Sequence, residues 1–234
     1  RCSVPIAKAM LTATTPAAPG RLMHTPQIEP LTVAPEDRAR NIVDLIHRSV
    51  ERNAGREALR WKPPKAQRAE GEEAAWTSRT YRQMWDWVTT LSLGLRDLGI
   101  ADGDSVAILA RTRPEWTVSD LASLALGAVT CPIYPQSEAG QAAFVINNVG
   151  AKLVIVENVQ QAHKIESIRA ECPTLEHVIS MEGSGKLPPG TLTLDDVMAR
   201  ADMEGANRLA WQDSWMAIDR EHHAYVIETL RRGL

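Results

Sequence analysis

The clearest pattern in the chain is a run of apolar residues at three- and four-residue spacing between positions 81 and 98. This spacing places the apolar side chains on one face of a helix. Thr80 and Gln83 fit a capping box, in which each side chain satisfies a backbone N–H group at the start of a helix. Gly99 stands where a left-handed cap is expected. The sequence therefore predicts an amphipathic helix whose inner face holds Tyr81, Met84, Trp85, Val88, Leu91, Leu95 and Leu98.

Short apolar segments alternate with helical segments over the rest of the chain. Such segments, bounded by turn residues, are typical of strands buried on both faces. Pro114 suits the first position of one intervening helix, and Ser137 is the expected N-cap of the next, which ends near Gly150. Thr193 is the expected cap of a later helix. We expect strands at 105–110, 129–134, 153–156, 177–181 and 224–227, and helices at 114–128, 137–150, 159–169 and 194–203.

This alternation predicts an α/β fold with a parallel sheet and helices on both of its faces. Before it, an amphipathic helix is expected from Glu36 to Gly55, followed by a hairpin with arms at 58–62 and 75–79. Residues 1–35 are rich in Ala, Thr and Pro and carry no acid before Glu29, which favours a flexible N-terminal tail over a transit peptide.

Composition excludes several classes of protein. The 234 residues are 44% hydrophobic and carry a net charge of −3, which gives no support for a nucleic-acid partner. No apolar run approaches the roughly 18 residues of a transmembrane segment. Cys2, Cys131 and Cys172 are far apart and form no C-x-x-C pair, which argues against a zinc site or a disulfide framework. A reducing, cytoplasmic location is expected.

Candidate chemistry is sparse. Gly185-Lys186 lacks the earlier glycine and the following Ser or Thr of a phosphate-binding loop, so we interpret it as a surface turn. His222 and His223 are adjacent and point apart, which favours a solvated turn over a metal pair. Cys131 is interpreted as a small core residue. We assign no catalytic, cofactor-binding or metal-ligating residue.

The tryptophans leave two interpretations open. Trp85, Trp87 and Trp116 lie in predicted helices and are interpreted as core residues. Trp211 and Trp215 bracket a polar loop, and they either pack over the sheet or face a partner.

The order of several short motifs resembles the N-terminal region of AMP-forming acyl-CoA synthetases, in the adenylate-forming ligase superfamily. Tyr134-Pro135 and the segment 147–158 are similar to the long-chain fatty-acid branch. The resemblance covers roughly residues 36–227. It is carried by Gly94-Leu95, Leu98-Gly99, Gly103-Asp104, Val106 to Ile108, Arg113 to Trp116, Leu126 to Val129, and Pro132, Tyr134 and Pro135.

The resemblance implies a two-step ligase reaction of lipid metabolism. A fatty-acid carboxylate attacks ATP to give an acyl-adenylate and pyrophosphate, and coenzyme A then displaces AMP. It implies ATP, Mg²⁺ and coenzyme A as cofactors, with Mg²⁺ shielding the phosphates. It also implies a homodimer and peripheral association with membranes.

The chain departs from the family pattern after Ile227. There the family continues into a Ser/Thr/Gly-rich phosphate loop, whereas residues 228–234 form a tail without that pattern. We therefore expect residues 36–227 to be an incomplete N-terminal subdomain, an N-terminal fragment of a long-chain fatty-acid–CoA ligase that is inactive alone. Two alternatives stay open: a catalytically dead module that pairs with an intact synthetase, and a poorly folded remnant without function.

Overall fold

The computed structural model describes residues 38–63, 75–219 and 221–225. The predicted tails at 1–35 and 228–234, and most of the predicted strand at 224–227, lie outside the described residues. The chain from residue 39 onward forms one unit, which holds the helices and strands described here.

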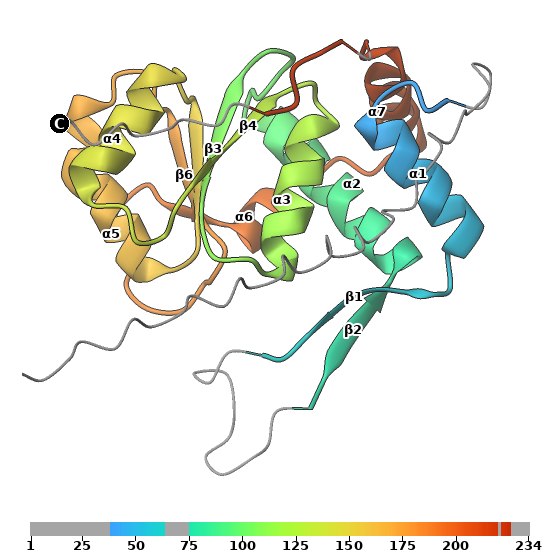
Figure 1. Ribbon diagram of the computed structural model, residues 1–234, viewed down its shortest axis with the longest axis horizontal. Coiled ribbons are helices and arrows are strands. Elements are labelled where there is room, and N and C mark those ends of the chain that lie inside the picture. Colours follow the sequence, from blue (N-terminus) through green and yellow to red (C-terminus); the bar gives the residue numbers. More distant parts are fainter. Residues whose placement is uncertain (1–37, 64–74, 220, 226–234) are drawn as a thin grey trace, which may run out of the picture. The chain divides into compact units, whose positions relative to one another are not determined.

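The centre of this unit is a parallel sheet of five strands in the order β4-β3-β5-β6-β7 (Figure 1). In register, Ala107 of β3 lies beside Cys131 of β4 and Val154 of β5. Cys131 is fully buried, as its interpretation as a core residue requires. The strands are β3 (Ser105–Leu109), β4 (Val129–Ile133), β5 (Leu153–Val156), β6 (His177–Ser180) and β7 (Leu192–Thr193).

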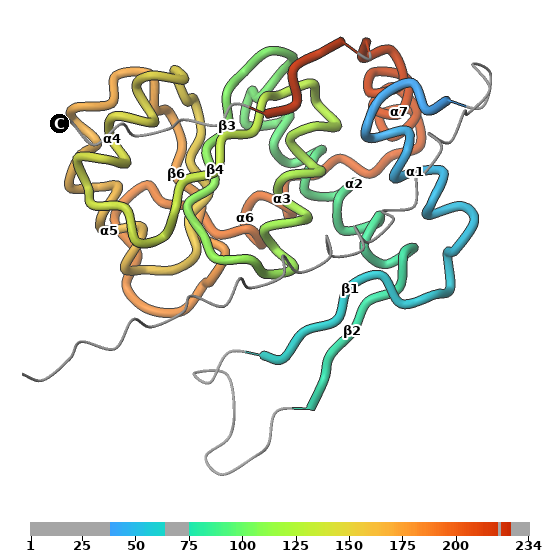
Figure 2. Tube along the Cα trace, viewed as in Figure 1, coloured from blue at the N-terminus to red at the C-terminus, as the bar shows by residue number. Residues whose placement is uncertain are grey.

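Helices cover both faces of the sheet, which confirms the predicted fold class. Strand side chains alternate between the faces, so Ile108 and Ile155 pack in one core and Leu109 and Val154 in the other. On the first face lie α1 (Ile42–Asn53), α2 (Tyr81–Asp97), α3 (Pro114–Leu124), α6 (Leu194–Met198) and α7 (Gly205–Ala217). On the second lie α4 (Ala139–Asn148) and α5 (Val159–Ile168), as the tube in Figure 2 also shows.

The best-signalled helix forms as expected. The Thr80 side chain accepts a hydrogen bond from the Gln83 amide at 3.2 Å, and the Gln83 side chain accepts one from the Thr80 amide at 2.9 Å. After α2, Gly99 has a φ of +86°, the left-handed conformation that glycine adopts most readily. The predicted hairpin also forms, from β1 (Glu57–Trp61) and β2 (Thr77–Thr80).

Several predicted boundaries are wrong, among them the end of the helix expected at 114–128, which lies at Leu124. The first helix begins at Ile42 rather than Glu36, because the Asn41 side chain accepts from the Asp44 amide and caps it there. The N-cap of α4 is Glu138, not Ser137. The helix after Thr193 ends at Met198 rather than position 203.

Helix α7 was not predicted from the sequence. Trp211 and Trp215 lie one turn apart on this helix rather than bracketing a loop. Both are at most 2% exposed, and their rings lie 5.8 and 6.0 Å from the ring of Trp85 on α2. They therefore belong to the core, and the interpretation that they face a partner is wrong. Trp85 is buried as predicted, whereas Trp87 and Trp116 are half-buried.

Candidate functional site

The chain segments that follow the parallel strands meet at the carboxyl edge of the sheet. The helix after β3 packs on one face, and the helices after β4 and β5 pack on the other. The chain segments that leave neighbouring strands therefore turn to opposite faces of the sheet and leave a crevice between them. Such a place is called a topological switch point, and ligands of doubly wound sheets bind there. A cleft of about 660 Å³ lies there, with Arg111, Trp116, Tyr134, Pro135, Ser137 and Val145 in its wall.

Arg111 and Glu157 form an ion pair across the β3–β5 switch point. The guanidinium donates to Glu157 from Nη2 at 2.7 Å and from Nε at 3.0 Å, and the Arg111 amide donates at 3.0 Å. Burial alone raises the pKa of Glu157, but the hydrogen bonds from Arg111 outweigh burial and the pKa is lowered. Glu157 is 5% exposed whereas the Arg111 side chain is 71% exposed. The buried carboxylate thus holds a cation at the mouth of the cleft.

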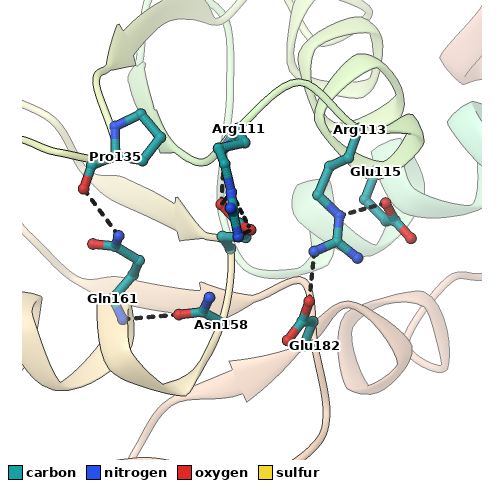
Figure 3. A network of polar contacts seen from close by, with 8 residues as sticks. Arg111, Arg113, Glu115, Pro135, Asn158, Gln161 and Glu182 are labelled. Atoms are coloured by element: carbon teal, nitrogen blue, oxygen red, sulfur yellow. Dashed lines mark hydrogen bonds and ion pairs between the residues drawn. The ribbon is translucent and has the colours of Figure 1, made fainter. Parts of the chain in front are cut away.

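A second arginine joins three segments of the same edge (Figure 3). Arg113 donates from Nε to Glu115 on α3 and from Nη1 to Glu182 beyond β6, each at 2.7 Å. Its side chain is only 13% exposed. Burial disfavours the charge, yet the two carboxylates raise the pKa of Arg113 above its usual value. These contacts hold the loop after β3 in place beside the cleft.

The loop after β4 forms the opposite wall and is held from α5. The Pro135 carbonyl accepts from Gln161 at 3.0 Å and from Lys164 at 3.1 Å, and Lys164 also donates to the Ser137 carbonyl at 2.8 Å. Tyr134, in the same loop, is 81% exposed. A rigid loop that presents an exposed aromatic ring is suited to contact a ligand or another protein surface.

The chemistry of the cleft suits binding rather than bond making. Arg111 is the charged residue among those named in its wall, and Trp116, Ile133 and Val145 are apolar. Such a wall fits a largely apolar ligand, because the charge of Arg111 is already paired with Glu157. The described residues contain no group of three or more His, Cys, Asp or Glu side chains that could hold a metal ion.

The segment that returns to the sheet lies beside β4. The Thr130 amide donates to the Ala224 carbonyl at 2.9 Å, and Thr130 and Tyr225 form a parallel bridge. The Tyr225 hydroxyl donates to Asp120 on α3 at 2.6 Å, and Asp120 is 5% exposed. Burial raises the pKa of Asp120 despite this hydrogen bond. The chain is thereby fixed at the edge of the sheet where the last strand was predicted.

Trp116, Tyr134 and Pro135, which were named from the sequence, line this cleft, whereas the glycine-lysine pair and the histidines considered for chemistry do not. Gly185 lies in a turn against Val159, and the Lys186 carbonyl contacts His163. His222 donates from Nε2 to the Gly127 carbonyl at 2.7 Å. Arg111 and Glu157 were not singled out, although each follows directly after a predicted buried strand, which is the signal that could have found them.

The fold is a doubly wound α/β sheet with a cleft at its carboxyl edge, the place where ligands of such sheets bind. The family model of AMP-binding enzymes matches residues 46–227, and the chain belongs to this family. Long-chain-fatty-acid–CoA ligase FadD15 of Mycobacterium bovis is 35% identical over 113 residues, which are 48% of this chain and 19% of FadD15. Long-chain-fatty-acid–CoA ligase heimdall of Drosophila melanogaster is 29% identical over 152 residues, 65% of this chain and 21% of heimdall.

Solved structures show the same fold. The crystal structure of a long-chain-fatty-acid–CoA ligase, FadD1 from Archaeoglobus fulgidus, matches with a TM-score of 0.61 at 13% identity, over 81% of this chain and 34% of that chain. The anthranilate CoA ligase AuaEII in complex with anthranoyl-AMP matches with a TM-score of 0.59 at 22% identity, over 78% of this chain and 30% of that chain. The chain spans about a fifth of the length of FadD15 and of heimdall.

Proposed function

We propose that this chain forms the N-terminal part of an ATP-dependent long-chain fatty-acid–CoA ligase. The observation that carries the proposal is the family match over 46–227, which coincides with the doubly wound sheet. In the reaction, a fatty-acid carboxylate oxygen bonds to the α-phosphorus of ATP and pyrophosphate leaves. The thiol of coenzyme A then attacks the acyl carbon and AMP leaves.

The carboxylates of the ion-pair network beside the cleft are the described residues to compare with a Mg²⁺ site. Glu157, Glu115 and Glu182 are the carboxylates nearest the cleft in the ion-pair network, and each is paired with an arginine. They do not fit a Mg²⁺ site, which needs free oxygen ligands. We therefore assign no contact to ATP, Mg²⁺ or coenzyme A within the described residues, and we derive no step through them.

The described residues contribute position rather than chemistry in this proposal. The Arg111–Glu157 and Arg113–Glu182 pairs fix the loop after β3, and Lys164 fixes the loop after β4. Both loops lie at the carboxyl edge, where ligands of such sheets bind. The remainder of a ligase would complete the site against this edge.

We further propose that the 234-residue chain does not adenylate fatty acids by itself. The test is acyl-hydroxamate formation by residues 1–234 with ATP, Mg²⁺, oleate and hydroxylamine, with intact FadD15 as the positive control. Hydroxamate is expected only from FadD15. ATP-dependent hydroxamate from residues 1–234 would overturn this part of the proposal.

The proposed substrate class also bears on the protein's contact with membranes. Fatty acids partition into lipid, so we propose peripheral membrane contact; a cytoplasmic location and a homodimer are proposed from the family resemblance. Among the described residues, no helix is long and apolar enough to cross a membrane. Membrane contact would then come from a surface of the fold.

A catalytically dead module that pairs with an intact synthetase is the second candidate. The observation that favours it is Tyr134, an 81% exposed ring on a rigid loop beside the cleft. Size-exclusion chromatography of residues 1–234 with FadD15 tests it. A complex that is lost on Tyr134→Ser favours the module, and separate elution of the two proteins opposes it.

A further inference from the structure

The β1–β2 hairpin carries an exposed aromatic residue between two cations. Figure 1 shows this hairpin projecting from the helices. The Arg60 guanidinium carbon lies 5.1 Å from the centre of the Trp76 ring, and the Lys62 ammonium nitrogen lies 5.2 Å from it. Trp76 is 57% exposed and the Arg60 side chain is 57% exposed. We call this cluster of Arg60, Lys62 and Trp76 the hairpin patch.

Strand geometry places the hairpin patch on the outer face. Trp61 pairs with Thr77 and Arg60 pairs with Ser78. Side chains alternate along a strand, so Arg60 and Lys62 share one face, and Leu59 and Trp61 share the other. Leu59 packs against the core, whereas Arg60 and Lys62 are exposed. The inner face thus anchors the hairpin, and the outer face presents the hairpin patch to solvent.

The hairpin is basic in a chain that is acidic overall. The described residues 54–63 and 75–82 carry five basic side chains, Arg56, Arg60, Lys62, Arg79 and Arg82, against the acid Glu57. Over the whole of 54–82 the sequence has seven basic and four acidic residues, whereas the full chain has a net charge of −3. Positive charge is therefore concentrated around the hairpin patch.

We propose that the hairpin patch docks on an anionic lipid surface. Tryptophan settles at the headgroup level of a bilayer, where its ring is apolar and its N–H group meets water. Lysine and arginine near the surface are attracted to anionic headgroups. A projecting tryptophan flanked by cations fits the headgroup level of a bilayer, so lipid is the ligand proposed here and nucleic acid is an outcome of the test. This inference rests on the peripheral membrane contact in the proposed function and names the surface that makes it.

Sedimentation of residues 1–234 with lipid vesicles tests the docking. The assay contains no ATP or coenzyme A, so its result does not depend on whether the chain takes part in a ligase reaction. We expect binding to vesicles of phosphatidylcholine with phosphatidylserine, weakened by added salt. The double variant Arg60→Gln/Lys62→Gln should bind these vesicles about thirtyfold more weakly, because each lost cation weakens the affinity by about fivefold. Equal binding to vesicles of phosphatidylcholine alone would overturn the proposal.

A matched control removes two exposed cations elsewhere. Lys186→Gln/Arg208→Gln changes the net charge by the same amount but leaves the hairpin untouched, since both residues are exposed and lie in the β6–β7 loop and on α7. It should keep most of the vesicle binding. If it weakens binding as much as the hairpin variant does, the attraction is general and the proposal fails.

Trp76 gives a readout at the lipid itself. Brominated phosphatidylserine should quench part of the tryptophan fluorescence of the wild-type chain, and the quenched part should be absent in Trp76→Phe. Unchanged quenching in Trp76→Phe would contradict insertion of this ring. Tighter binding to a single-stranded oligonucleotide than to anionic vesicles would also overturn the lipid assignment. Near-ultraviolet circular dichroism confirms that each variant is folded.

Discussion

Gly94, in the last turn of α2, allows α6 to pack unusually close. A Cβ atom at this position would lie 2.8 Å from the Val197 carbonyl carbon and 3.0 Å from Val197 Cγ1, and closer still to the Val197 carbonyl oxygen. The obstacle is mainly backbone, so a side chain on residue 94 cannot be accommodated by a rotamer change. Gly94→Ala must push α6 away from α2.

The expected effect is the difference of two opposing contributions. Alanine in place of glycine within a helix favours folding by about 1 kcal/mol. Overpacking a dense core costs about 1–3 kcal/mol or more, and the displaced helix α6 carries the buried side chains of Leu194 and Val197. Because the Cβ atom would meet backbone atoms, the overpacking cost at this site should lie at the upper end of that range. We therefore expect a net loss of about 2 kcal/mol, or roughly 4–8 °C in Tm for a domain of this size.

Urea unfolding followed by tryptophan fluorescence measures this loss, because Trp211 and Trp215 pack against Trp85 on α2. The matched control is Gly140→Ala, in the first turn of α4, where a Cβ atom meets nothing within 4 Å. That variant should be as stable as the wild type or slightly more stable. If the two variants have equal stability, the close packing of α2 and α6 is refuted.

Three further predictions concern the buried polar contacts. Glu157→Gln should lower stability by about 1 kcal/mol, a figure discounted for the exposure of Arg111. The pKa of Glu157 is lowered in the folded state, so the stability difference between the wild type and Glu157→Gln should reach its full size above the usual pKa of 4.5. The difference should vanish as the pH falls through the lowered pKa, and urea unfolding at several pH values measures it. Tyr225→Phe should cost about 1–3 kcal/mol by removing the donor to the buried Asp120 carboxylate, and this cost should be absent in an Asp120→Ala background, which has no acceptor, if the contact is the cause. Trp211→Phe removes the 2.8 Å hydrogen bond to the Ser92 hydroxyl, and it should cost about 1 kcal/mol more in the wild-type chain than in a Ser92→Ala background.

The regular elements could be predicted because their local signals agree with their tertiary contacts. The capping box at Thr80 and the apolar run at 153–156 gave element positions within a residue or two. Helix α7 was missed because its buried residues are only two tryptophans one turn apart, Trp211 and Trp215, and its other apolar residues follow no clear helical stripe. Both rings pack against Trp85, more than 120 positions earlier in the chain, and no local pattern contains that contact.

The cleft was harder to predict than the fold. Arg111 and Glu157 are 46 positions apart, and only the adjacency of β3 and β5 brings them together. Strand order is set by long-range packing, which local periodicity does not encode. The same holds for Arg113 and Glu182, which are 69 positions apart.

The most direct test of the account is a chimera in which residues 46–227 replace the matching region of FadD15 from Mycobacterium bovis. If this chain is the N-terminal part of a long-chain fatty-acid–CoA ligase, the folded chimera should form oleoyl-CoA from oleate, ATP and coenzyme A. A folded, monodisperse chimera that forms no acyl-CoA would contradict that claim.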